Sequence, residues 1–306
     1  MKSQNILVTG GLGFIGSHLV DKLIDNGHKV YVIDNLSTGR KRNSNDLAKY
    51  YYLDINKFIN SSIELIKIIK KNNIHSVFHL AANANVNASL NNPGEMLKVN
   101  FNASVAILEA CKKTSLKKFI FASTSAVFGE PKYLPVDELH PIDPISPYGL
   151  SKLMFENYNK YFSKSSKISI INFRLPNVYG ERQRADLEGG VIAIFSERIK
   201  KDLKVNIYGN GNQKRDWVHV IDIVNAFEKS LYYNFKNEVI SLGSLEANTV
   251  NNLFALLSSR LNYKKKPNYL KARNGDIKYM IMDNTKAKKL IKWAPSINFI
   301  DGIKLI

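Results

Sequence analysis

Along the first part of the chain, short apolar runs alternate with longer stretches in which apolar side chains recur every three or four positions. The short runs are typical of buried parallel strands, and the longer period is typical of helices that pack on them. Strands are expected at 6–8, 29–33, 51–53, 77–80, 119–122 and 168–173. Helices are expected at 17–24, 62–71, 93–114 and 147–161. This alternation predicts an α/β fold in which a doubly wound parallel sheet is covered by helices on both faces.

The pattern changes near residue 180. Glycine-containing loops are expected at 188–190 and 209–211, and helices at 220–232 and 250–261. A last buried strand is expected at 239–242. We therefore expect residues 1–176 to form the sheet domain. Residues 177–306 are expected to form mainly a smaller lobe, interleaved with the sheet, whose loops face a substrate.

Three glycines follow the first strand, Gly10, Gly13 and Gly16, and a helical pattern begins after them. Glycine at these places permits a tight turn, close approach of the backbone to a ligand, and close packing of the helix on the strand. The N-terminus of that helix presents free N–H groups and the positive end of the helix dipole, which suits a pyrophosphate. The pattern predicts a dinucleotide-binding turn.

Asp34 ends the second strand, about twenty residues after the glycines. A carboxylate there can accept hydrogen bonds from an adenosine ribose, which favours NAD over its 2′-phosphorylated form. The basic residues Arg40, Lys41 and Arg42 leave NADP open as an alternative. We therefore expect NAD as the cofactor of a Rossmann-type domain over residues 1–176.

The composition is that of a water-soluble globular protein, since 44% of the 306 residues are apolar and 23% are charged. The chain has no run of about eighteen apolar residues, so no membrane span is expected. The first strand lies so near the N-terminus that no signal peptide is expected, and a single cysteine fits a reducing compartment. These features together predict a cytoplasmic protein.

Two residues with reactive side chains are expected in the core. Cys111 lies within the apolar pattern of a helix, where packing is a more common role than reactivity. His79 stands in an apolar strand, and a lone histidine there is more often a hydrogen-bonded core residue than a catalyst. Neither residue is therefore included among the candidate catalytic residues.

Basic residues outnumber acidic ones by 44 to 26, which gives a net charge of +18. Nucleic-acid binding is one interpretation of this surplus. The lysines are scattered along helices and loops, however, and only short clusters occur, such as 264–266. A positive surplus also attracts small anionic substrates, and we favour such a substrate over nucleic acid as the partner.

Tyr148 and Lys152 stand four residues apart in an expected helix and therefore share one of its faces. A free phenol has a pKa of about 10, and a lysine charge beside it favours the phenolate. Such a tyrosinate can remove a proton from a sugar hydroxyl while a nicotinamide takes the hydride. Because this spacing is common on ordinary amphipathic helices, the interpretation depends on its context: the dinucleotide turn, and Thr124 at the end of a strand about two dozen residues upstream.

These motifs resemble those of the extended short-chain dehydrogenase/reductase family, and within it the nucleotide-sugar epimerases. The resemblance covers nearly the whole chain, and its ordered blocks are 9–16, 34–39, 79–82, 123–129, 148–152, 177–180, 215–222 and 273–276. It implies a Rossmann-type fold with a smaller C-terminal substrate-binding lobe, NAD as cofactor, and a nucleotide sugar, expected to be a UDP-sugar, as substrate. It also implies a homodimer formed through helices 93–114 and 147–161.

The resemblance implies roles at individual positions. Tyr148 is the implied base, Lys152 the implied partner of the nicotinamide ribose, and Thr124 the implied hydrogen-bond donor to the sugar oxygen. The implied cofactor-binding residues are Gly10, Gly13, Phe14, Ile15, Gly16, Asp34, Asn35, Asp54, Ile55, Ala81, Ala82, Tyr148 and Lys152. The implied substrate-binding residues are Thr124, Asn177, Arg215, Arg273, Asp276 and Met280, and no metal site is implied. For the two arginines, a surface salt bridge with Asp216 or Asp276 is the alternative to binding a diphosphate.

Ser125 and Ala126 follow Thr124, where the resemblance places an acidic pair in dehydratases and a glutamate in decarboxylases. Without those groups the simplest reaction is reversible hydride transfer, and we expect 4-epimerisation of the sugar through a 4-keto intermediate. Met280 is expected to crowd an acetamido group, which favours UDP-glucose and UDP-galactose over UDP-GlcNAc. If Arg184 faces a substrate carboxylate, UDP-glucuronate is indicated instead; a solvated loop charge is the more common role. Another reaction of the family, or a non-catalytic NAD(P)-sensing or RNA-binding protein, stays open.

Overall fold

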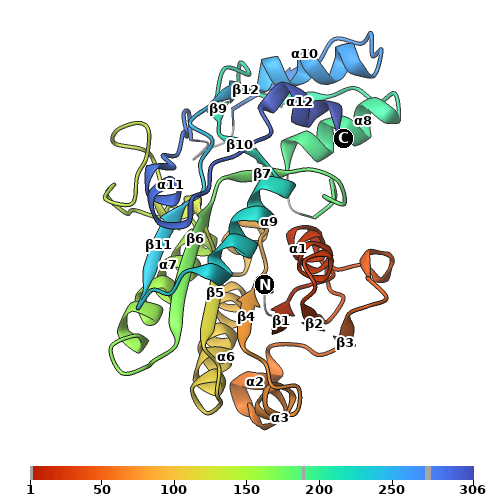
Figure 1. Ribbon diagram of the computed structural model, residues 1–306. Coiled ribbons are helices and arrows are strands. Elements are labelled where there is room, and N and C mark those ends of the chain that lie inside the picture. Colours follow the sequence, from red (N-terminus) through yellow and green to blue (C-terminus); the bar gives the residue numbers. More distant parts are fainter. Residues whose placement is uncertain (1–2, 188–189, 273–276) are drawn as a thin grey trace.

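The computed structural model describes residues 3–187, 190–272 and 277–306. Its centre is a seven-stranded parallel sheet in the order β11-β6-β5-β4-β1-β2-β3 (Figure 1). The strands are β1 (Asn5–Thr9), β2 (Lys29–Ile33), β3 (Lys49–Tyr51), β4 (Ser76–His79), β5 (Lys118–Thr124), β6 (Ser169–Leu175) and β11 (Glu238–Ser241). From β1 the chain builds first towards β3 and then in the opposite direction from β4. A crevice for a ligand is therefore expected at the carboxyl ends of β1 and β4, where the direction reverses.

Every strand of the sheet that the sequence predicts is present, which confirms the doubly wound fold. The third strand differs in its position, because it covers Lys49–Tyr51 and not 51–53. The Leu53 amide donates to the Tyr51 carbonyl at 3.1 Å, so the chain turns away at this point and Leu53 leaves the sheet.

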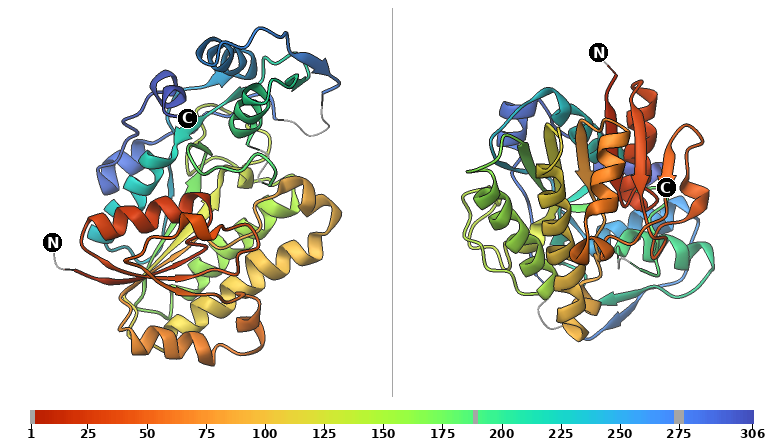
Figure 2. Two further views of the ribbon diagram at one scale, coloured as in Figure 1. Left: turned by 90° about the vertical axis from the view of Figure 1, so that its right-hand side faces the viewer. Right: turned by 90° about the horizontal axis from the view of Figure 1, so that it is seen from below.

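Alternate residues of the strands enter two separate cores, one on each face of the sheet. On β1, Ile6 and Val8 face one core and Leu7 faces the other. The helices over the first core are α1 (Phe14–Asp25), α9 (Val220–Lys229) and α11 (Thr285–Ile291). Those over the second core are α2 (Lys57–Asn60), α3 (Ile63–Lys71), α6 (Ala103–Lys112) and α7 (Pro147–Phe162). The left view of Figure 2 shows α1 and the α2–α3 segment on opposite sides of the strands.

The helix expected over 93–114 is not a regular α-helix. It consists of α5 (Pro93–Leu97), a π-helical turn (Lys98–Asn102) and α6, and it follows a short helix, α4 (Val86–Asn91), that the pattern does not predict. Asn100 in the π-helical turn is buried; its Oδ1 accepts from the Asn83 amide at 2.8 Å, and its Nδ2 donates to the Ser151 hydroxyl at 3.1 Å. The wider turn therefore directs one side chain to both the segment after β4 and α7.

The smaller lobe begins at the carboxyl end of β6 and is the upper part of Figure 1. Its elements are α8 (Val191–Lys200), α10 (Val250–Arg260), α12 (Phe299–Lys304), and three strand pairs: β7 (Asn177–Tyr179) with β10 (Trp217–His219), β9 (Lys214–Arg215) with β12 (Asn248–Thr249), and β8 (Asn206–Tyr208) with β13 (Asn268–Leu270). A separate core holds the lobe together and includes Ile192, Phe195, Trp217, Leu253 and Phe299. Between β10 and β12 the chain returns to the sheet through α9 and β11, so lobe and sheet are interleaved.

Candidate functional site

The glycine turn connects β1 to α1 at the point where the strand order reverses, beside Ala81 and Ala82 after β4. Gly10 has a φ of +73°, and a β-carbon there would stand 2.8 Å from the Ala81 amide nitrogen. A β-carbon on Gly16 would stand 2.1 Å from the Gly10 carbonyl oxygen. Within the described residues, no side chain caps α1 at Gly13 and no acidic residue lies in its first turn. The turn leaves bare amides and the positive end of the helix facing the crevice, which fits a dinucleotide pyrophosphate.

Asp34 follows β2 directly and is almost fully buried. Its Oδ2 accepts from the Leu12 amide at 2.9 Å and its Oδ1 from the Leu36 amide at 2.8 Å. These bonds tie the carboxylate to the glycine turn. A carboxylate has about four acceptor positions, so about two remain for ribose hydroxyls, and Asp34 fits the adenosine end of NAD.

Five other residues expected to bind the cofactor differ in whether their side chains are polar and near the crevice or packed in a core. Asn35 Nδ2 donates to Asp54 Oδ2 at 3.2 Å, which joins the segments that follow β2 and β3. The Ile55 side chain is buried in the second core. Phe14 and Ile15 form the first turn of α1, and their side chains pack into the first core. Asn35 and Asp54 thus keep polar groups near the crevice, whereas the other three side chains contribute packing.

A buried series of hydrogen bonds holds the segment after β4. The Ala81 amide donates to Thr9 Oγ1 at 3.2 Å, and Thr9 Oγ1 lies 2.7 Å from His79 Nδ1. His79 Nε2 lies 2.8 Å from Ser104 Oγ, and the Ser104 hydroxyl donates to the Asn100 carbonyl. Nε2 must therefore carry the hydrogen, while Nδ1 accepts from Thr9. Burial lowers the pKa of His79 to about 3, so His79 is the neutral core residue that the sequence predicts.

Thr124 ends β5, and Tyr148 is the second residue of α7. The Thr124 hydroxyl oxygen accepts from the Ala126 amide at 3.1 Å, which caps a 3₁₀ turn. The Ser146 hydroxyl caps α7 by accepting from the Gly149 amide at 3.1 Å. A β-carbon on Gly149 would stand 2.4 Å from the Ala126 carbonyl oxygen. The first turn of α7 therefore lies directly against the turn that follows Thr124.

Lys152 lies one turn after Tyr148 on α7 and is only 3% exposed. Its ammonium donates to the Ala122 carbonyl at 2.8 Å and lies 4.7 Å from the centre of the Phe121 ring. Burial lowers the pKa of Lys152 to about 7, although the Glu156 carboxylate acts in the opposite direction. The charge expected to acidify the phenol is thus itself titratable near neutral pH, which the sequence pattern alone does not predict.

Three buried polar residues lie beside the site, and two of them, Glu156 and Arg174, are not marked by any motif. Ser123 donates from its hydroxyl to Glu156 Oε1 at 2.5 Å, and Arg174 donates to both oxygens of Glu156, at 3.1 and 2.7 Å. Glu156 stands four residues after Lys152 in a predicted helix, and this spacing is a usable sequence signal. Arg174 comes from a neighbouring strand, so its partnership with Glu156 depends on the tertiary structure.

The expected substrate-binding residues of the smaller lobe come from neighbouring short strands. Asn177, on β7, donates from its backbone amide and from Nδ2 to the Asp216 carbonyl at 3.2 and 3.3 Å. Arg215, on β9, is partly exposed and donates from Nη1 to the Lys214 carbonyl at 3.0 Å. The Met280 amide donates to the same carbonyl at 3.2 Å, so Arg215 and Met280 belong to adjoining segments.

The Asp216 carboxylate is buried and joins segments of the lobe. Its Oδ1 accepts from the Ser244 hydroxyl at 2.7 Å, and its Oδ2 accepts from the Met282 amide at 2.9 Å. Burial raises the pKa of Asp216 to about 7. The other acid considered as a salt-bridge partner for the arginines, Asp276, lies outside the described residues, as does Arg273.

Met280 is buried in a small apolar cluster with Val127, Phe128 and Met282. Val127 lies in the turn that follows Thr124. The residue expected to limit the size of the sugar is therefore close to the turn that Thr124 caps.

Two further expectations concern Arg184 and Cys111. Arg184 forms an ion pair with Asp186 at 2.6 Å and donates to the Thr38 carbonyl at 3.0 Å, so it meets a carboxylate of its own chain. Cys111 is buried on α6, and burial raises the pKa of its thiol, in agreement with the expected packing role.

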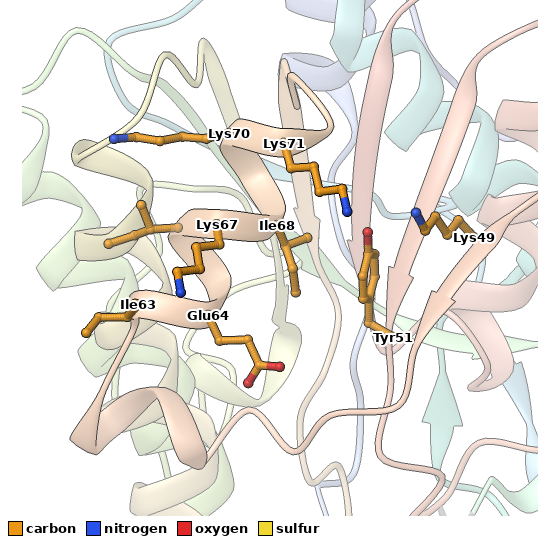
Figure 3. A pocket seen from close by; sticks show the side chains of 9 residues that line it. Lys49, Tyr51, Ile63, Glu64, Lys67, Ile68, Lys70 and Lys71 are labelled. Atoms are coloured by element: carbon orange, nitrogen blue, oxygen red, sulfur yellow. The ribbon is translucent and has the colours of Figure 1, made fainter.

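Two hollows lie apart from the candidate catalytic residues. The first, of about 730 Å³, lies between β3 and α3 at the edge of the sheet (Figure 3), and its labelled lining residues are Lys49, Tyr51, Ile63, Glu64, Lys67, Ile68, Lys70 and Lys71. The second, of about 800 Å³, is lined by Arg40, Arg42, residues 180–186 and part of α8. Neither lining includes a candidate catalytic residue.

Over residues 3–187, 190–272 and 277–306, no three His, Cys, Asp or Glu side chains are grouped so that they could bind a metal ion. In the same part of the chain, no helix has the length and apolarity required to span a bilayer.

The chain is similar to known proteins along nearly all of its length. The model of a family described as "NAD dependent epimerase/dehydratase family" matches residues 6–243. The UDP-glucose 4-epimerase of Thermotoga maritima, solved with UDP-glucose, is 41% identical with a TM-score of 0.94, over 98% of this chain and 96% of that one. The UDP-glucose 4-epimerase of Thermus thermophilus, solved with NAD, is 32% identical with a TM-score of 0.90, over 98% of this chain and 97% of that one. The UDP-N-acetylglucosamine 4-epimerase of Methanobrevibacter ruminantium, solved with UDP-N-acetylmuramic acid, is 36% identical with a TM-score of 0.91, over 100% of this chain and 98% of that one.

Proposed function

Since the chain belongs to the NAD dependent epimerase/dehydratase family and its cofactor is NAD, we propose that it inverts C4 of a UDP-linked sugar, with UDP-glucose and UDP-galactose as the preferred pair. The observation that carries this proposal is the contact between the first turn of α7 and the turn after Thr124. That contact supports a common site for Thr124, Tyr148 and Lys152 at the carboxyl ends of the strands. The glycine turn, at the same edge of the sheet, supports a place for the cofactor beside them.

In the proposed reaction, Tyr148 is the base that removes the proton of the sugar 4-hydroxyl. The Lys152 ammonium favours the phenolate, and burial strengthens this interaction because the local dielectric constant is low. Thr124 Oγ1 accepts from the Ala126 amide, so its own hydrogen is available for the sugar oxygen. NAD, which the glycine turn and Asp34 would hold, would supply the hydride acceptor and donor for C4, so that the 4-keto sugar can be reduced on its other face. Tyr148 then returns the proton, and the reaction has no net redox change.

The proposed contacts with the diphosphate and the sugar of the substrate come from the smaller lobe. Arg215, on β9, is suited to a substrate diphosphate because a guanidinium matches the spacing of phosphate oxygens, and Asn177 on β7 is its proposed polar neighbour. Arg273 and Asp276 are proposed in the same role by family resemblance. Met280 supports a hexose without an acetamido group, because its long side chain occupies space beside the turn after Thr124.

A second candidate substrate is UDP-GlcNAc. It is favoured by the 36% identity to an epimerase of that sugar, whose chain is matched over 98% of its length. UDP-glucuronate receives less support, because the guanidinium of Arg184 is paired with Asp186.

The test is to incubate the purified protein with UDP-glucose, UDP-GlcNAc and UDP-glucuronate in separate reactions and to identify the products by NMR. We expect UDP-galactose from UDP-glucose, and a much slower reaction with the other two. Tyr148→Phe should retain NAD and lose turnover by about two to four orders of magnitude, since a general base contributes about 10²–10⁴-fold. Turnover in Tyr148→Phe equal to that of the parent would contradict the assigned chemistry, and conversion of none of the three sugars would contradict the function.

The roles of the two parts of the chain, the oligomeric state and the cellular location are also proposals. We propose that residues 1–176 bind NAD, that residues 177–306 mainly bind the substrate, and that the protein is a cytoplasmic homodimer. Exposed apolar side chains on the helices implied in the dimer support the assembly, since Leu150 and Tyr161 of α7 are 43% and 68% exposed. Light scattering after size-exclusion chromatography should give twice the 34.7 kDa chain mass.

A further inference from the structure

Two charged side chains of α7, one turn apart, reach the last residues of β5 from inside the molecule. Lys152 donates to the Ala122 carbonyl at 2.8 Å, and Glu156 accepts from the Ser123 hydroxyl at 2.5 Å. The two charged residues are only 3% and 4% exposed. Since Thr124 is the next residue of β5, these bonds fix α7 against the strand that ends in the proposed hydrogen-bond donor.

Glu156 is also the partner of Arg174, which lies opposite Ser123 in the register of β6 against β5. The guanidinium donates from Nε and Nη2 to the two carboxylate oxygens at 3.1 and 2.7 Å, which is a bidentate pair. Nη1 has no hydrogen-bond partner among the described residues, and the guanidinium carbon lies 4.8 Å from the centre of the Phe128 ring. The ring face therefore covers the part of the cation that the carboxylate leaves open.

This buried cluster contains two cations and one anion. The guanidinium engages both oxygens of Glu156, so the carboxylate acts on Lys152 mainly through space. A phenolate at Tyr148 would supply the second negative charge and make the cluster neutral. We propose that Glu156 and Arg174 form a positioning pair for the reaction: the pair holds α7 against β5 and β6, and the Glu156 carboxylate supplies the buried negative charge that keeps Lys152 protonated beside Tyr148. The inference rests on the proposed function, because it takes Tyr148 as the base.

Few titratable groups among the described residues face the Lys152 ammonium. Tyr148 and Glu156 are on its own helix, residues 121–124 of β5 are uncharged, and Arg174 on β6 lies behind Glu156. His79 on β4 is neutral, since burial lowers its pKa to about 3. Glu156 is the group that raises the pKa of Lys152 against the larger effect of burial. Removing the Glu156 charge therefore lowers the pH at which Lys152 loses its proton, and removing the Arg174 charge raises it.

The titration of Lys152 is measured by NMR on protein labelled with ¹³C at lysine Cε, with the signal assigned by Lys152→Met. Glu156→Gln should lower its midpoint by about one pH unit, and Arg174→Met should raise it by a smaller amount, because the guanidinium lies behind Glu156. The matched control is Glu228→Gln, which removes another buried carboxylate, on α9, that accepts from the Tyr232 hydroxyl. This control should leave the Lys152 midpoint unchanged.

The pH profile of kcat gives a second readout. The alkaline limb, where Lys152 loses its proton, should move to lower pH in Glu156→Gln by the same amount as the NMR midpoint. KM for the UDP-sugar should stay within about twofold of the parent value, because the pair touches neither the sugar nor the nucleotide. A merely structural role would lower stability and leave both the midpoint and the limb in place.

An unshifted Lys152 midpoint in both variants, or an equal shift in Glu228→Gln, overturns the inference. If Glu156→Gln does not fold, the direction of the shift in Arg174→Met decides. If neither variant folds, Ser123→Ala decides, because it keeps the charges of Glu156 and Arg174 but loosens Glu156 from β5. We expect Ser123→Ala to have a severalfold lower kcat at unchanged KM. An unchanged kcat in this variant overturns the inference. The NMR titration requires no turnover, so its failure is distinct from failure of the proposed function, which Tyr148→Phe tests.

Discussion

A β-carbon on Gly149 would stand 2.4 Å from the carbonyl oxygen of Ala126, so these two residues meet at a contact that only glycine allows. Gly149 follows Tyr148 directly, and Ala126 is the residue whose amide donates to Thr124. The contact therefore sets how close the proposed base lies to the proposed hydrogen-bond donor.

Gly149→Ala should lower kcat by about tenfold to a hundredfold, because displacement of a positioned group by about 1 Å can cost a factor of this size. NAD binding should change little, since the glycine turn is not involved. The matched control is Gly94→Ala on α5, where a β-carbon meets nothing within 4 Å. Steady-state kinetics of both variants check the prediction, and equal activities would show that the contact does not control the chemistry.

Gly16→Ala should weaken NAD binding by about a hundredfold or more, which corresponds to about 2.7 kcal/mol. The physical reason is that the new β-carbon would stand 2.1 Å from the Gly10 carbonyl oxygen, so the turn must open and its amides move. Calorimetry on protein stripped of NAD measures the loss. An affinity equal to that of the parent would place the pyrophosphate elsewhere.

The stability of the protein should fall in acid, partly because of His79. Its pKa is lowered to about 3 in the folded protein, against about 6.5 in an unfolded chain. Between these two values the unfolded state binds more protons, so the free energy of unfolding decreases as the pH falls, by up to about 4–5 kcal/mol for this group.

His79→Gln keeps one donor and one acceptor but does not titrate. We therefore expect it to be less stable than the parent at pH 7 and to show a flatter decline between pH 6.5 and pH 4. Urea unfolding of both proteins across this range measures the difference, and parallel declines would show that His79 does not contribute.

Met280→Ala should increase kcat/KM for UDP-GlcNAc relative to UDP-glucose, by about tenfold or more, since removing several methylene-sized groups is worth about 1–3 kcal/mol in a pocket. It should also cost about 2–5 kcal/mol of stability, because Met280 is buried. The control is Met282→Ala in the same apolar cluster, which should lose similar stability without the change in preference. The prediction fails if both variants keep the parent ratio of the two sugars.

Much of the fold could be predicted from the sequence because its signals are local. Gly10, Gly13 and Gly16 mark a turn, and at Gly10 and Gly16 the requirement for glycine is visible in the contacts that a β-carbon would make. Asp34 marks the end of a strand, and its place follows from the apolar run that precedes it. The alternation of strands and helices then fixes a parallel sheet.

What could not be predicted depends on contacts between distant segments. The π-helical turn around Asn100 follows from bonds to Asn83 and Ser151, which no helical period encodes. The ion pair of Glu156 and Arg174 joins a helix to a strand and becomes apparent only when the register of β6 against β5 is known.

The chain passes between the sheet and the smaller lobe several times: β7 leaves β6, α9 and β11 rejoin the sheet, β12 and α10 leave it again, and α11 returns to pack beside β11. One recombination event therefore cannot transplant the lobe as a cassette, because a junction before β11 divides the sheet and a junction after β11 leaves α8 and β7–β10 of the lobe behind. In a lineage with this connectivity, we expect a new sugar preference to arise through point substitutions, for which position 280 is the proposed example.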